Sequence, residues 1–488
     1  MNLLERINHW SLVAPHAIAH VNGERTLTYG ELAARSNAVA AYLRDYCGDD
    51  RTPVAVLGQR EQEMVIAFLG AVKAGRPYIP INTTLPNQRI AHILEIGRPG
   101  TVLTPPEIAD ICQSRNGSSR AHGTEIQPDD PFYIIFTSGS SGEPKGIVVT
   151  HRCLEHFLTW MIREQKFADL SETFLNQAPF SFDLSVMDLY CSLATGGTLF
   201  SLGRDLIGDP KLLYRALALS NVTTWVSTPS FVEMCLVERG FNDSLVPRVC
   251  RFLFCGETLL PKTADLLSKR FPHAEIWNLY GPTEATVATT SVRIDSNILA
   301  KYPALPVGRP MPGTQVSVVD ENRNSLPEGS SGEIIIKGPN VSAGYLRRAD
   351  LTAAAFSNAN GQRSYFTGDR GRFEDGMLFF EGRIDRQVKV NGHRIELGDV
   401  EENLRALPMV RDASVVPVGR NGKVHWLAGF VVPELDYQTT GAPLIHRLRE
   451  DLSRRVPAYM LPRKFVVLDR FPITANGKID RQKLSESL

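Results

Sequence analysis

A loop rich in glycine and hydroxyl side chains directly follows an apolar run, and this arrangement constrains the fold most. The run 132–136 reads FYIIF and predicts a strand, and the run 147–149 predicts the next one. The loop between them reads TSGSSGEPKG. Glycines let backbone N–H groups approach phosphate oxygens, hydroxyls add donors, and Lys145 supplies a positive charge. The loop is therefore a candidate phosphate-binding site, although such a stretch alone also suits an exposed surface loop.

The spacing within this loop excludes the Walker type of phosphate loop. A Walker loop needs G-x-x-x-x-G-K-[ST], whereas Lys145 lies three residues after Gly142 and precedes Gly146. A P-loop kinase is thereby excluded.

Helical and strand-like patterns alternate along the chain, which is typical of an α/β fold with a parallel sheet. We expect helices at 32–43 and 64–73 and strands at 54–57, 223–226, 252–254, 315–319 and 333–337. The last hundred residues form a separate pattern, with strands expected at 383–390, 414–418 and 426–432 and a helix at 397–407. The sequence therefore predicts a large α/β domain followed by a small α+β domain.

Composition excludes several classes of protein. The 488 residues carry 53 Lys and Arg against 53 Asp and Glu, so no chain-wide basic field for nucleic acid exists. No apolar run reaches the ~18 residues of a membrane helix, and Glu5 and Arg6 interrupt any secretory signal. Seven cysteines with no C-x-x-C pair argue against zinc and disulfides. We therefore expect a cytosolic protein that neither binds nucleic acid nor inserts into a membrane.

Four further motifs carry residues suited to nucleotide chemistry. The first, 278–284, reads NLYGPTE, in which Tyr280 suits stacking on a purine and Glu284 suits Mg²⁺. The second, 365–369, reads YFTGD and places Asp369 at an expected strand end, where ribose hydroxyls are often bound. The others are GRIDRQVK at 382–389, followed by NGHRIE, and NGKID at 476–480. Each motif alone also suits an ordinary turn.

Together, in this order, the five motifs resemble the adenylate-forming superfamily, in particular the amino-acid adenylation enzymes related to nonribosomal peptide synthetases. The resemblance covers essentially the whole chain. The segments FSFDLSVMDLY at 180–190, STPSF at 227–231 and FLFCGE at 252–257 are most similar to stand-alone ligases that load D-alanine onto a carrier protein.

The resemblance implies a two-step ligase reaction that uses ATP and Mg²⁺. A small amino acid attacks the α-phosphorus of ATP to give an aminoacyl-AMP, which then reacts with the phosphopantetheine thiol of a separate carrier protein. The implied domains are 1–383 and 386–488, joined by a hinge at 384–385. Residues 383–488 carry 18 Lys and Arg against 13 Asp and Glu, which suits an acidic carrier.

The resemblance also assigns roles to individual residues. The implied catalytic residues are Lys478, Thr137 and Glu284, with Glu284 as the metal ligand. Nucleotide contacts are implied for Thr137, Ser138, Gly139, Lys145, Gly256, Glu257, Asn278, Tyr280, Gly281, Thr283, Asp369, Arg383 and Lys478. Asp385 matches the hinge, and Gly392 matches the glycine that lines the pantetheine tunnel.

The implied amino-acid pocket has one charged residue. Asp183 matches the carboxylate that pairs with the substrate α-amino group, although it also suits the N-cap of a helix beginning at Leu184. The remaining lining is apolar: Leu184, Met187, Val226, Leu253, Cys255, Leu279, Val287 and Ala288. This lining predicts a small amino acid with an uncharged side chain. Asp183, as the counter-charge of an amino group, argues against fatty acids, acetate, aryl acids and an oxygenating, luciferase-like activity.

The exact amino acid stays open. Cys255 favours D-alanine, whereas Leu279 narrows the pocket and is similar to ligases that load L-proline. L-Alanine and L-serine remain alternatives, because one methylene group too many or too few changes the binding free energy of a substrate by only ~1–3 kcal/mol. A different class, a non-catalytic scaffold that binds nucleotide or a carrier protein, should have lost Lys478, Glu284 or Asp369, and all three are present.

Overall fold

A computed structural model covers the chain and describes residues 1–48, 50–115, 126–139, 142–359, 361–420, 423–434, 441–473 and 479–488. The chain divides into two units, which are described separately. Unit 1 comprises Met1–Asn82, Gly97–Ile135 and Ile147–Glu381. Unit 2 comprises Thr83–Ile96, Phe136–Gly146 and Gly382–Leu488.

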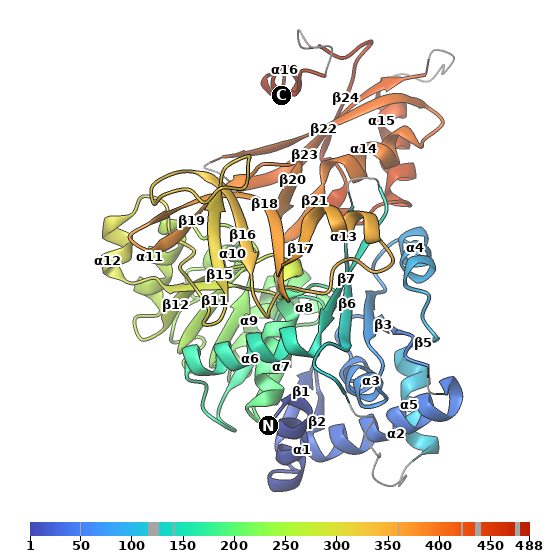
Figure 1. Cartoon of the computed structure of the whole chain (residues 1–488), viewed down its shortest axis with the longest axis vertical. Coiled ribbons are helices and arrows are strands. Elements are labelled where there is room, and N and C mark those ends of the chain that lie inside the picture. Colours follow the sequence, from blue (N-terminus) through green and yellow to red (C-terminus); the bar gives the residue numbers. More distant parts are fainter. Residues whose placement is uncertain are drawn as a thin grey trace. The chain divides into compact units, whose positions relative to one another are not determined.

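The largest described sheet, in unit 1, has nine strands (Figure 1). Its order is β14 (Arg309–Pro310), β13 (Thr290–Arg293), β12 (Glu275–Tyr280), β11 (Arg251–Phe254), β10 (Thr224–Ser227), β8 (Thr173–Asn176), β9 (Thr198–Ser201), β1 (Ile18–Asn22) and β2 (Arg25–Thr28). The run from β12 to β1 is parallel, and the outer strands β13, β14 and β2 pair antiparallel. The carboxyl ends of the parallel strands therefore meet along one edge, where open α/β sheets bind ligands.

Two further sheets carry residues of unit 1. One has the order β5 (Thr101–Leu103), β3 (Val54–Gly58), β4 (Tyr78–Asn82), β6 (Pro131–Thr137) and β7 (Lys145–Thr150). The other contains β15 (Gln315–Val319), β16 (Gly332–Lys337), β18 (Gln362–Glu374), β17 (Phe356–Ala359) and β19 (Met377–Arg383). Its described pairings are antiparallel.

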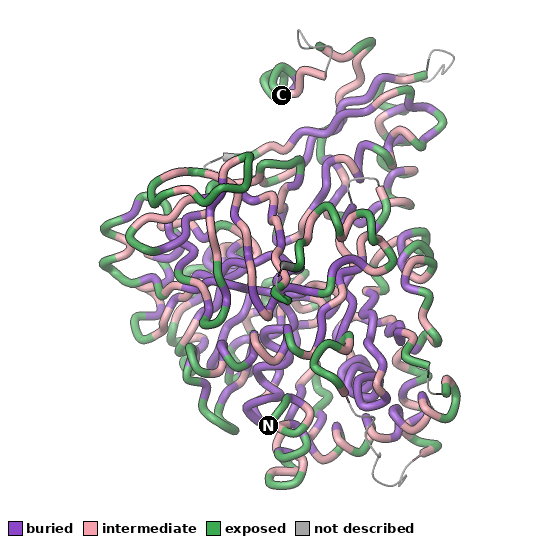
Figure 2. Tube along the Cα trace, in the orientation of Figure 1, coloured by how far each residue is buried: buried purple, intermediate pink, exposed green. Residues whose placement is uncertain are grey.

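Two helices are buried on every side. α3 (Gln62–Lys73) packs on β3 and β4 of one sheet and on β1 of the nine-stranded sheet, and all twelve of its residues are buried. α7 (Leu184–Ala194) packs on β8, β9 and β10, and all eleven of its residues are buried. Both sequences are apolar around most of the helix, as a helix between two layers requires. Figure 2 shows α3 as a buried segment.

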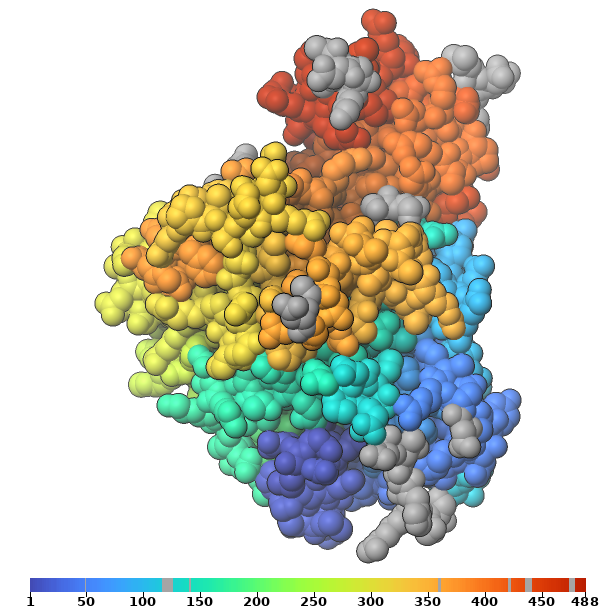
Figure 3. All heavy atoms as spheres, in the orientation of Figure 1, coloured from blue at the N-terminus to red at the C-terminus, as the bar shows by residue number. Residues whose placement is uncertain are grey.

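The other helices of unit 1 lie around the sheets. They are α1 (Leu3–Val13), α2 (Tyr29–Cys47), α5 (Pro105–Ser114), α6 (His151–Gln165), α8 (Arg204–Gly208), α9 (Pro210–Leu219), α10 (Pro229–Leu236), η1 (Thr283–Ala285), α11 (Pro261–Arg270), α12 (Ser296–Lys301) and α13 (Ala349–Ala355). α1 forms the dark blue surface in Figure 3: Leu3, Ile7 and Trp10 are buried, whereas Leu12 and Val13 are exposed.

Unit 2 is built on its own five-stranded sheet. The order is β21 (His393–Glu396), β20 (Gln387–Val390), β23 (Lys423–Pro433) and β22 (Val410–Arg420), with β24 (Lys464–Val467) on β23. The helices are α4 (Asn87–Gly97), α14 (Leu397–Arg405), α15 (Gly441–Ser453), η2 (Ala458–Met460) and α16 (Arg481–Glu486). Leu404, Val415 and Leu448 are among the side chains of its separate core.

The mixed α/β class expected from the sequence is confirmed, and most expected elements exist. The expected strand over 383–390 is wrong as one element, because β19 ends at Arg383 and β20 begins at Gln387. Asp369 lies within the long strand β18 and not at a strand end. None of the described helices has the length and apolar character needed to cross a membrane.

Candidate functional site

Four expected pocket residues lie on neighbouring parallel strands or directly after one of them. Val226 of β10 is paired with Leu253 of β11, and Phe254 is paired with Asn278 of β12. Cys255 and Leu279 each come one residue after this pair, so they lie opposite each other where the same register continues. Residues at one level of adjacent parallel strands present their side chains to the same face. The sheet therefore brings these four residues together at its carboxyl edge.

All eight apolar pocket candidates belong to one contiguous buried cluster. Leu184 and Met187 come from the first turns of α7, and the others come from β10, β11, β12 and the segment after η1. The Cys255 thiol donates to the carbonyl oxygen of Val287 at 3.5 Å. The candidates thus converge in unit 1.

The segment after η1 holds a strained backbone. Thr286 has φ of +59° and Val287 has φ of +68°, a region that β-branched residues rarely adopt. The Thr286 hydroxyl donates to the carbonyl of Asn340 at 2.7 Å, which helps to hold this conformation. Backbone strain of this kind clusters at ligand sites, since it costs ~1–3 kcal/mol per residue and persists only when surroundings impose it.

Asp183 lies at the N-cap position of α7 and is 8% exposed. Its own backbone is helical, with φ of −61° and ψ of −24°, and in this described turn its side chain accepts no capping hydrogen bond. The carboxylate also contributes, after burial, to raising the pKa of the neighbouring Tyr133 hydroxyl. The alternative role of Asp183 as a side-chain cap is therefore not seen, and its buried side chain comes directly before the pocket candidate Leu184 in the chain.

Glu284, in η1, is fully buried. One carboxylate oxygen, Oε1, accepts a hydrogen bond from the Tyr345 hydroxyl at 2.8 Å, and the backbone carbonyl accepts from Ser342 N–H at 2.9 Å. Thr283, one residue earlier, is 7% exposed. Tyr345 was not expected from the sequence, because no local pattern links positions 61 residues apart.

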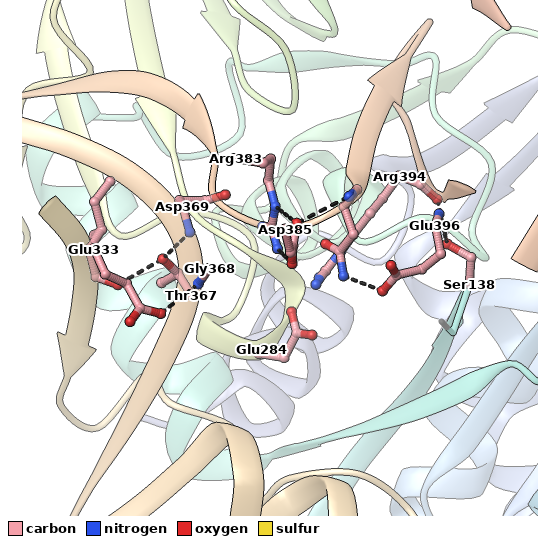
Figure 4. A network of polar contacts seen from close by, with 12 residues as sticks. Ser138, Glu284, Glu333, Thr367, Gly368, Asp369, Arg383, Asp385, Arg394 and Glu396 are labelled. Atoms are coloured by element: carbon pink, nitrogen blue, oxygen red, sulfur yellow. Dashed lines mark hydrogen bonds and ion pairs between the residues drawn. The ribbon is translucent and has the colours of Figure 1, made fainter. Parts of the chain in front are cut away.

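Tyr280, at the end of β12, donates its hydroxyl to Asp369 Oδ2 at 2.5 Å. The Thr367 hydroxyl accepts from Asp369 N–H and donates to the Ile334 carbonyl. Glu333 Oε1 accepts from Gly368 N–H at 2.9 Å, and Figure 4 shows this group of contacts around β18. Tyr280 and Asp369, expected to contact the base and the ribose, thus lie together.

Four further residues that were expected to contact the nucleotide lie within β12 or directly after β11 or β12. Gly256 and Glu257 come directly after β11, and the Glu257 carboxylate accepts from Ser230 N–H at 2.9 Å. Asn278, within β12, donates its amide to the Pro306 carbonyl at 2.8 Å, and Gly281 follows β12. These residues therefore lie at the same sheet edge as Tyr280.

In unit 2, the predicted phosphate loop contacts β21. The Ser138 hydroxyl donates to the Arg394 carbonyl at 2.9 Å and accepts from Glu396 N–H at 3.1 Å (Figure 4). Lys145 Nζ lies 3.2 Å from Glu396 Oε1, and both side chains are largely buried. The Thr137 Oγ1 atom is buried without a hydrogen-bond partner among the described residues. An unpaired buried hydroxyl is costly, so Thr137 is suited to a ligand.

The close approach at Gly139 explains why this loop needs glycine. A Cβ atom there would lie 2.1 Å from the Glu143 carbonyl oxygen. The loop is also held by Arg89 of α4, which donates to the Gly142 carbonyl at 3.2 Å and pairs with Asp399 at 3.1 Å. Burial raises the pKa of Asp399 to about 6, although Arg89 opposes the rise.

The remaining candidates of unit 2 have local partners. Arg383 forms a two-pronged ion pair with Asp385, with Nε 2.8 Å from Oδ1 (Figure 4). Asn391 and Gly392 both have positive φ and form the two-residue turn between β20 and β21. Asn-Gly is the commonest sequence for this turn. Lys478 lies outside the described residues.

Two family models match the chain. One, the AMP-binding enzyme model, matches residues 7–346, and the other, the AMP-binding enzyme C-terminal domain, matches residues 399–478.

Curated relatives match over the full length. The chain is 41% identical over 503 residues to the D-alanine–D-alanyl carrier protein ligase of Bacillus anthracis, covering 99% of each chain. It is also 41% identical over 504 residues to the ligase of the same name from Bacillus thuringiensis, with the same coverage.

Solved structures share the fold. The Vibrio cholerae adenylation domain AlmE, solved with glycyl-adenosine-5′-phosphate, has a TM-score of 0.85 at 21% identity, covering 99% of this chain and 97% of that one. PA1221, a nonribosomal peptide synthetase protein with adenylation and carrier domains, has a TM-score of 0.82 at 25% identity, covering 100% and 84%.

The unpaired hydroxyl of Thr137 generates a prediction. Thr137→Val keeps the shape and removes no intramolecular hydrogen bond seen among the described residues, so the free energy of unfolding should not fall and should rise by up to about 1–3 kcal/mol. ATP affinity, measured by calorimetry, should fall about tenfold, because a hydroxyl that suits the phosphates is lost.

Thr223→Val is the matched control. Its hydroxyl donates to Glu172 at 2.6 Å, so this variant should lose about 1–3 kcal/mol of stability and keep its ATP affinity. Equal loss of stability in both variants, or unchanged ATP affinity in Thr137→Val, would contradict the role of Thr137.

Proposed function

Because the chain belongs to the AMP-binding enzyme family, we propose that it is an ATP-dependent ligase that loads a small amino acid onto a carrier protein. D-Alanine is the favoured substrate, as in the names of its 41% identical relatives. The observation that carries the proposal is the buried carboxylate of Asp183 beside a pocket of apolar side chains. Such a pocket suits a compact molecule with one cationic nitrogen. The proposed reaction takes place in the cytosol.

In the first proposed step, an oxygen of the amino-acid carboxylate attacks the α-phosphorus of ATP. The bond from that phosphorus to the bridging oxygen breaks, and pyrophosphate leaves with the electron pair. Two anions must meet, so catalysis depends on shielding and alignment. Thr137, Ser138, Gly139, Lys145 and Thr283 are the proposed phosphate contacts, and Lys478 is the proposed cation between the carboxylate and the α-phosphate.

Lys145, one of the proposed phosphate contacts, already has a negatively charged partner. Its ammonium is paired with Glu396, whose carboxylate also accepts from the Gln387 amide. A phosphate that binds Lys145 must compete with Glu396, and a multiply charged phosphate is the stronger partner for a single ammonium.

Magnesium is the proposed companion of the nucleotide. Glu284 offers a buried carboxylate with an oriented oxygen, and the described residues contain no group of three His, Cys, Asp or Glu that would form a protein cage. This fits Mg²⁺, which often binds through one carboxylate and the phosphates of the substrate. When bound, the metal would neutralise phosphate charge, while Tyr345 orients the Glu284 carboxylate.

The adenosine moiety has a proposed place at the carboxyl edge of the nine-stranded sheet. Tyr280 offers a ring, and Gly256 and Gly281 offer backbone without side chains beside it. Asp369, positioned by the Tyr280 hydroxyl, is the proposed ribose contact, and Arg383 is the second. Glu257 and Asn278 complete the proposed nucleotide contacts.

Two features of the pocket point to different small amino acids. Cys255 supports D-alanine, and its thiol is turned toward the Val287 carbonyl. Leu279, fully within the buried cluster, narrows the pocket and supports L-proline as the second candidate. The two candidates differ in volume and handedness, so a substrate panel separates them.

In the second proposed step, a phosphopantetheine thiolate attacks the aminoacyl carbonyl carbon. AMP leaves, a thioester forms, and the thiol proton is released. Gly392 is the proposed lining of the thiol tunnel, and Asp385 is the proposed hinge between residues 1–383 and 386–488. An acidic carrier protein is the proposed acceptor, on the charge surplus of residues 383–488.

The proposed function predicts the outcome of an amino-acid panel. Pyrophosphate exchange into ATP should depend on D-alanine most strongly, with L-alanine, L-serine, glycine and L-proline slower, because the pocket suits a small D-amino acid. Exchange fastest with L-proline would establish the second candidate. Exchange with none of these amino acids would contradict the proposed function.

Asp183 provides the sharpest test of the pocket. Asp183→Ala should lower kcat/KM for the amino acid at least about a hundredfold in the exchange assay, since a buried ammonium would lose its counter-charge. ATP affinity should stay unchanged. Asp205→Ala, on the exposed helix α8, is the control and should behave as wild type. Unchanged turnover in Asp183→Ala would refute the assignment.

Lys478 should separate the two steps. Lys478→Ala should lower adenylation by about a hundredfold or more, because it removes ~3 kcal/mol of transition-state stabilisation. Transfer from added, presynthesised aminoacyl-AMP to the carrier should continue, as followed by mass spectrometry of the carrier. Equal loss of both steps would contradict the proposed division of labour.

A further inference from the structure

A buried polar network joins three strands of the nine-stranded sheet to helix α7, which begins directly after Asp183. It contains His20 of β1, Arg60 after β3, Asn176 of β8, Asp188 of α7 and Ser201 of β9, which we call the Asn176 clamp. His20, Asn176 and Asp188 are 0% exposed, Ser201 is 1% exposed and Arg60 is 8% exposed. Unsatisfied groups are costly at this depth, so the arrangement of these five side chains is tightly determined.

Asn176 is the centre of the network, and every hydrogen-bonding group of its amide is used. Its Nδ2 donates to the Ala178 carbonyl at 3.0 Å and to Asp188 Oδ1 at 3.0 Å. Its Oδ1 accepts from the Ser201 hydroxyl at 2.8 Å, so His20 Nε2 must be the donor to Ser201 at 2.8 Å. Burial lowers the pKa of His20 to about 3, which keeps the ring neutral. The amide therefore has one satisfied orientation.

Arg60 and Asp188 are the two remaining ionisable groups of this network. Arg60 donates to the Gln177 carbonyl, next to Asn176 in the chain. Burial lowers the pKa of Arg60 to about 10, so it stays cationic at neutral pH. Burial raises the pKa of Asp188 well above its usual range, whereas Asn176 and Arg60 lower it. The side-chain atoms Asp188 Oδ2 and Arg60 Nε have no hydrogen-bond partner among the described residues.

Asn176 binds the segment that carries Asp183 on both sides of that residue. Asn176 contacts the Ala178 carbonyl before Asp183 and the Asp188 carboxylate after it. Asp188 lies five residues beyond Asp183 in α7, and Met187 is its immediate neighbour. Asp183 is the N-cap residue of α7, so the position of its backbone depends on where this segment and α7 are held.

We propose that Asp188 is a positioning residue: through its hydrogen bond with Asn176, it fixes helix α7 and thereby sets the Asp183 carboxylate against the amino group of the substrate. This inference rests on the proposed function. The inference goes beyond that function, because it assigns a part in amino-acid recognition to a side chain that does not touch the substrate. A shift of the Asp183 carboxylate should weaken amino-acid binding while leaving the nucleotide contacts in place.

The test is the kinetics of Asp188→Ala in the pyrophosphate exchange assay. Alanine removes the acceptor of the Asn176 amide and so releases α7 from β8 at this contact. KM for the amino acid should rise about tenfold, whereas KM for ATP and kcat should stay within about twofold. A merely structural role would instead reduce the active fraction, which lowers kcat at unchanged KM. The melting temperature is measured in parallel.

Two further variants make the result decisive. Ser201→Ala removes the donor that orients the Asn176 amide and should raise the amino-acid KM about threefold. Asp205→Ala makes the same chemical change as Asp188→Ala on the exposed helix α8 and should leave both KM values unchanged. If Asp188→Ala fails to fold, Ser201→Ala decides the question alone.

The outcomes separate this inference from the proposed function. A wild-type enzyme that activates no amino acid contradicts the proposed function. An active wild type whose folded Asp188→Ala or Ser201→Ala variant keeps its amino-acid KM overturns the inference alone. The same conclusion follows if KM for ATP rises in parallel with KM for the amino acid.

Discussion

Burying a carboxylate costs free energy that its partners must offset, and unit 1 buries several of them at one end of a sheet. Glu172, away from the site, has a permanent cationic partner in Arg251 at 2.8 Å. Glu284 and Asp369 each accept from a tyrosine hydroxyl, which orients an oxygen but adds no positive charge. Asp183 is buried directly before Leu184, the first of the proposed pocket residues. A cationic amino group is the natural complement of that carboxylate in the proposed pocket.

The architecture explains why these side chains meet. Parallel strands β10, β11 and β12 end at one edge, and the loops that follow them supply the residues proposed to bind the nucleotide and the amino acid. α7 is buried on all sides, so the helix that carries Leu184 and Met187 cannot shift without disturbing two layers. The pocket is thus built on rigid elements, and the proposed clamp adds polar contacts to the apolar packing.

Much of the fold was predictable because its patterns are local. The apolar runs at 132–136 and 252–254 and the helical spacing at 64–73 correspond to β6, β11 and α3. The strand expected over 383–390 was wrong because Ile384 to Arg386 forms the bend that Asp385 and Arg383 stabilise. Alternating side chains predict a strand, but they do not show where an ion pair turns the chain.

The site was predictable only where motifs recur within a short stretch. Tyr280 and Glu284 lie in one motif, so the sequence indicated them together. Tyr345 and Glu396 were missed, because their contacts with Glu284 and Lys145 join positions 61 and 251 residues apart. The Asn176 clamp was not predicted either, because its five side chains come from separate parts of the chain and look like ordinary core or loop residues.

The central claim is that the Asp183 carboxylate recognises a cationic amino group. The most direct measurement is calorimetric titration with two unreactive adenylate analogues, D-alanyl sulfamoyl-adenosine and its propionyl counterpart, which lacks only the amino group. The account predicts that the amino compound binds at least about a hundredfold more tightly, a difference of roughly 3 kcal/mol. Equal binding of the two compounds would contradict it.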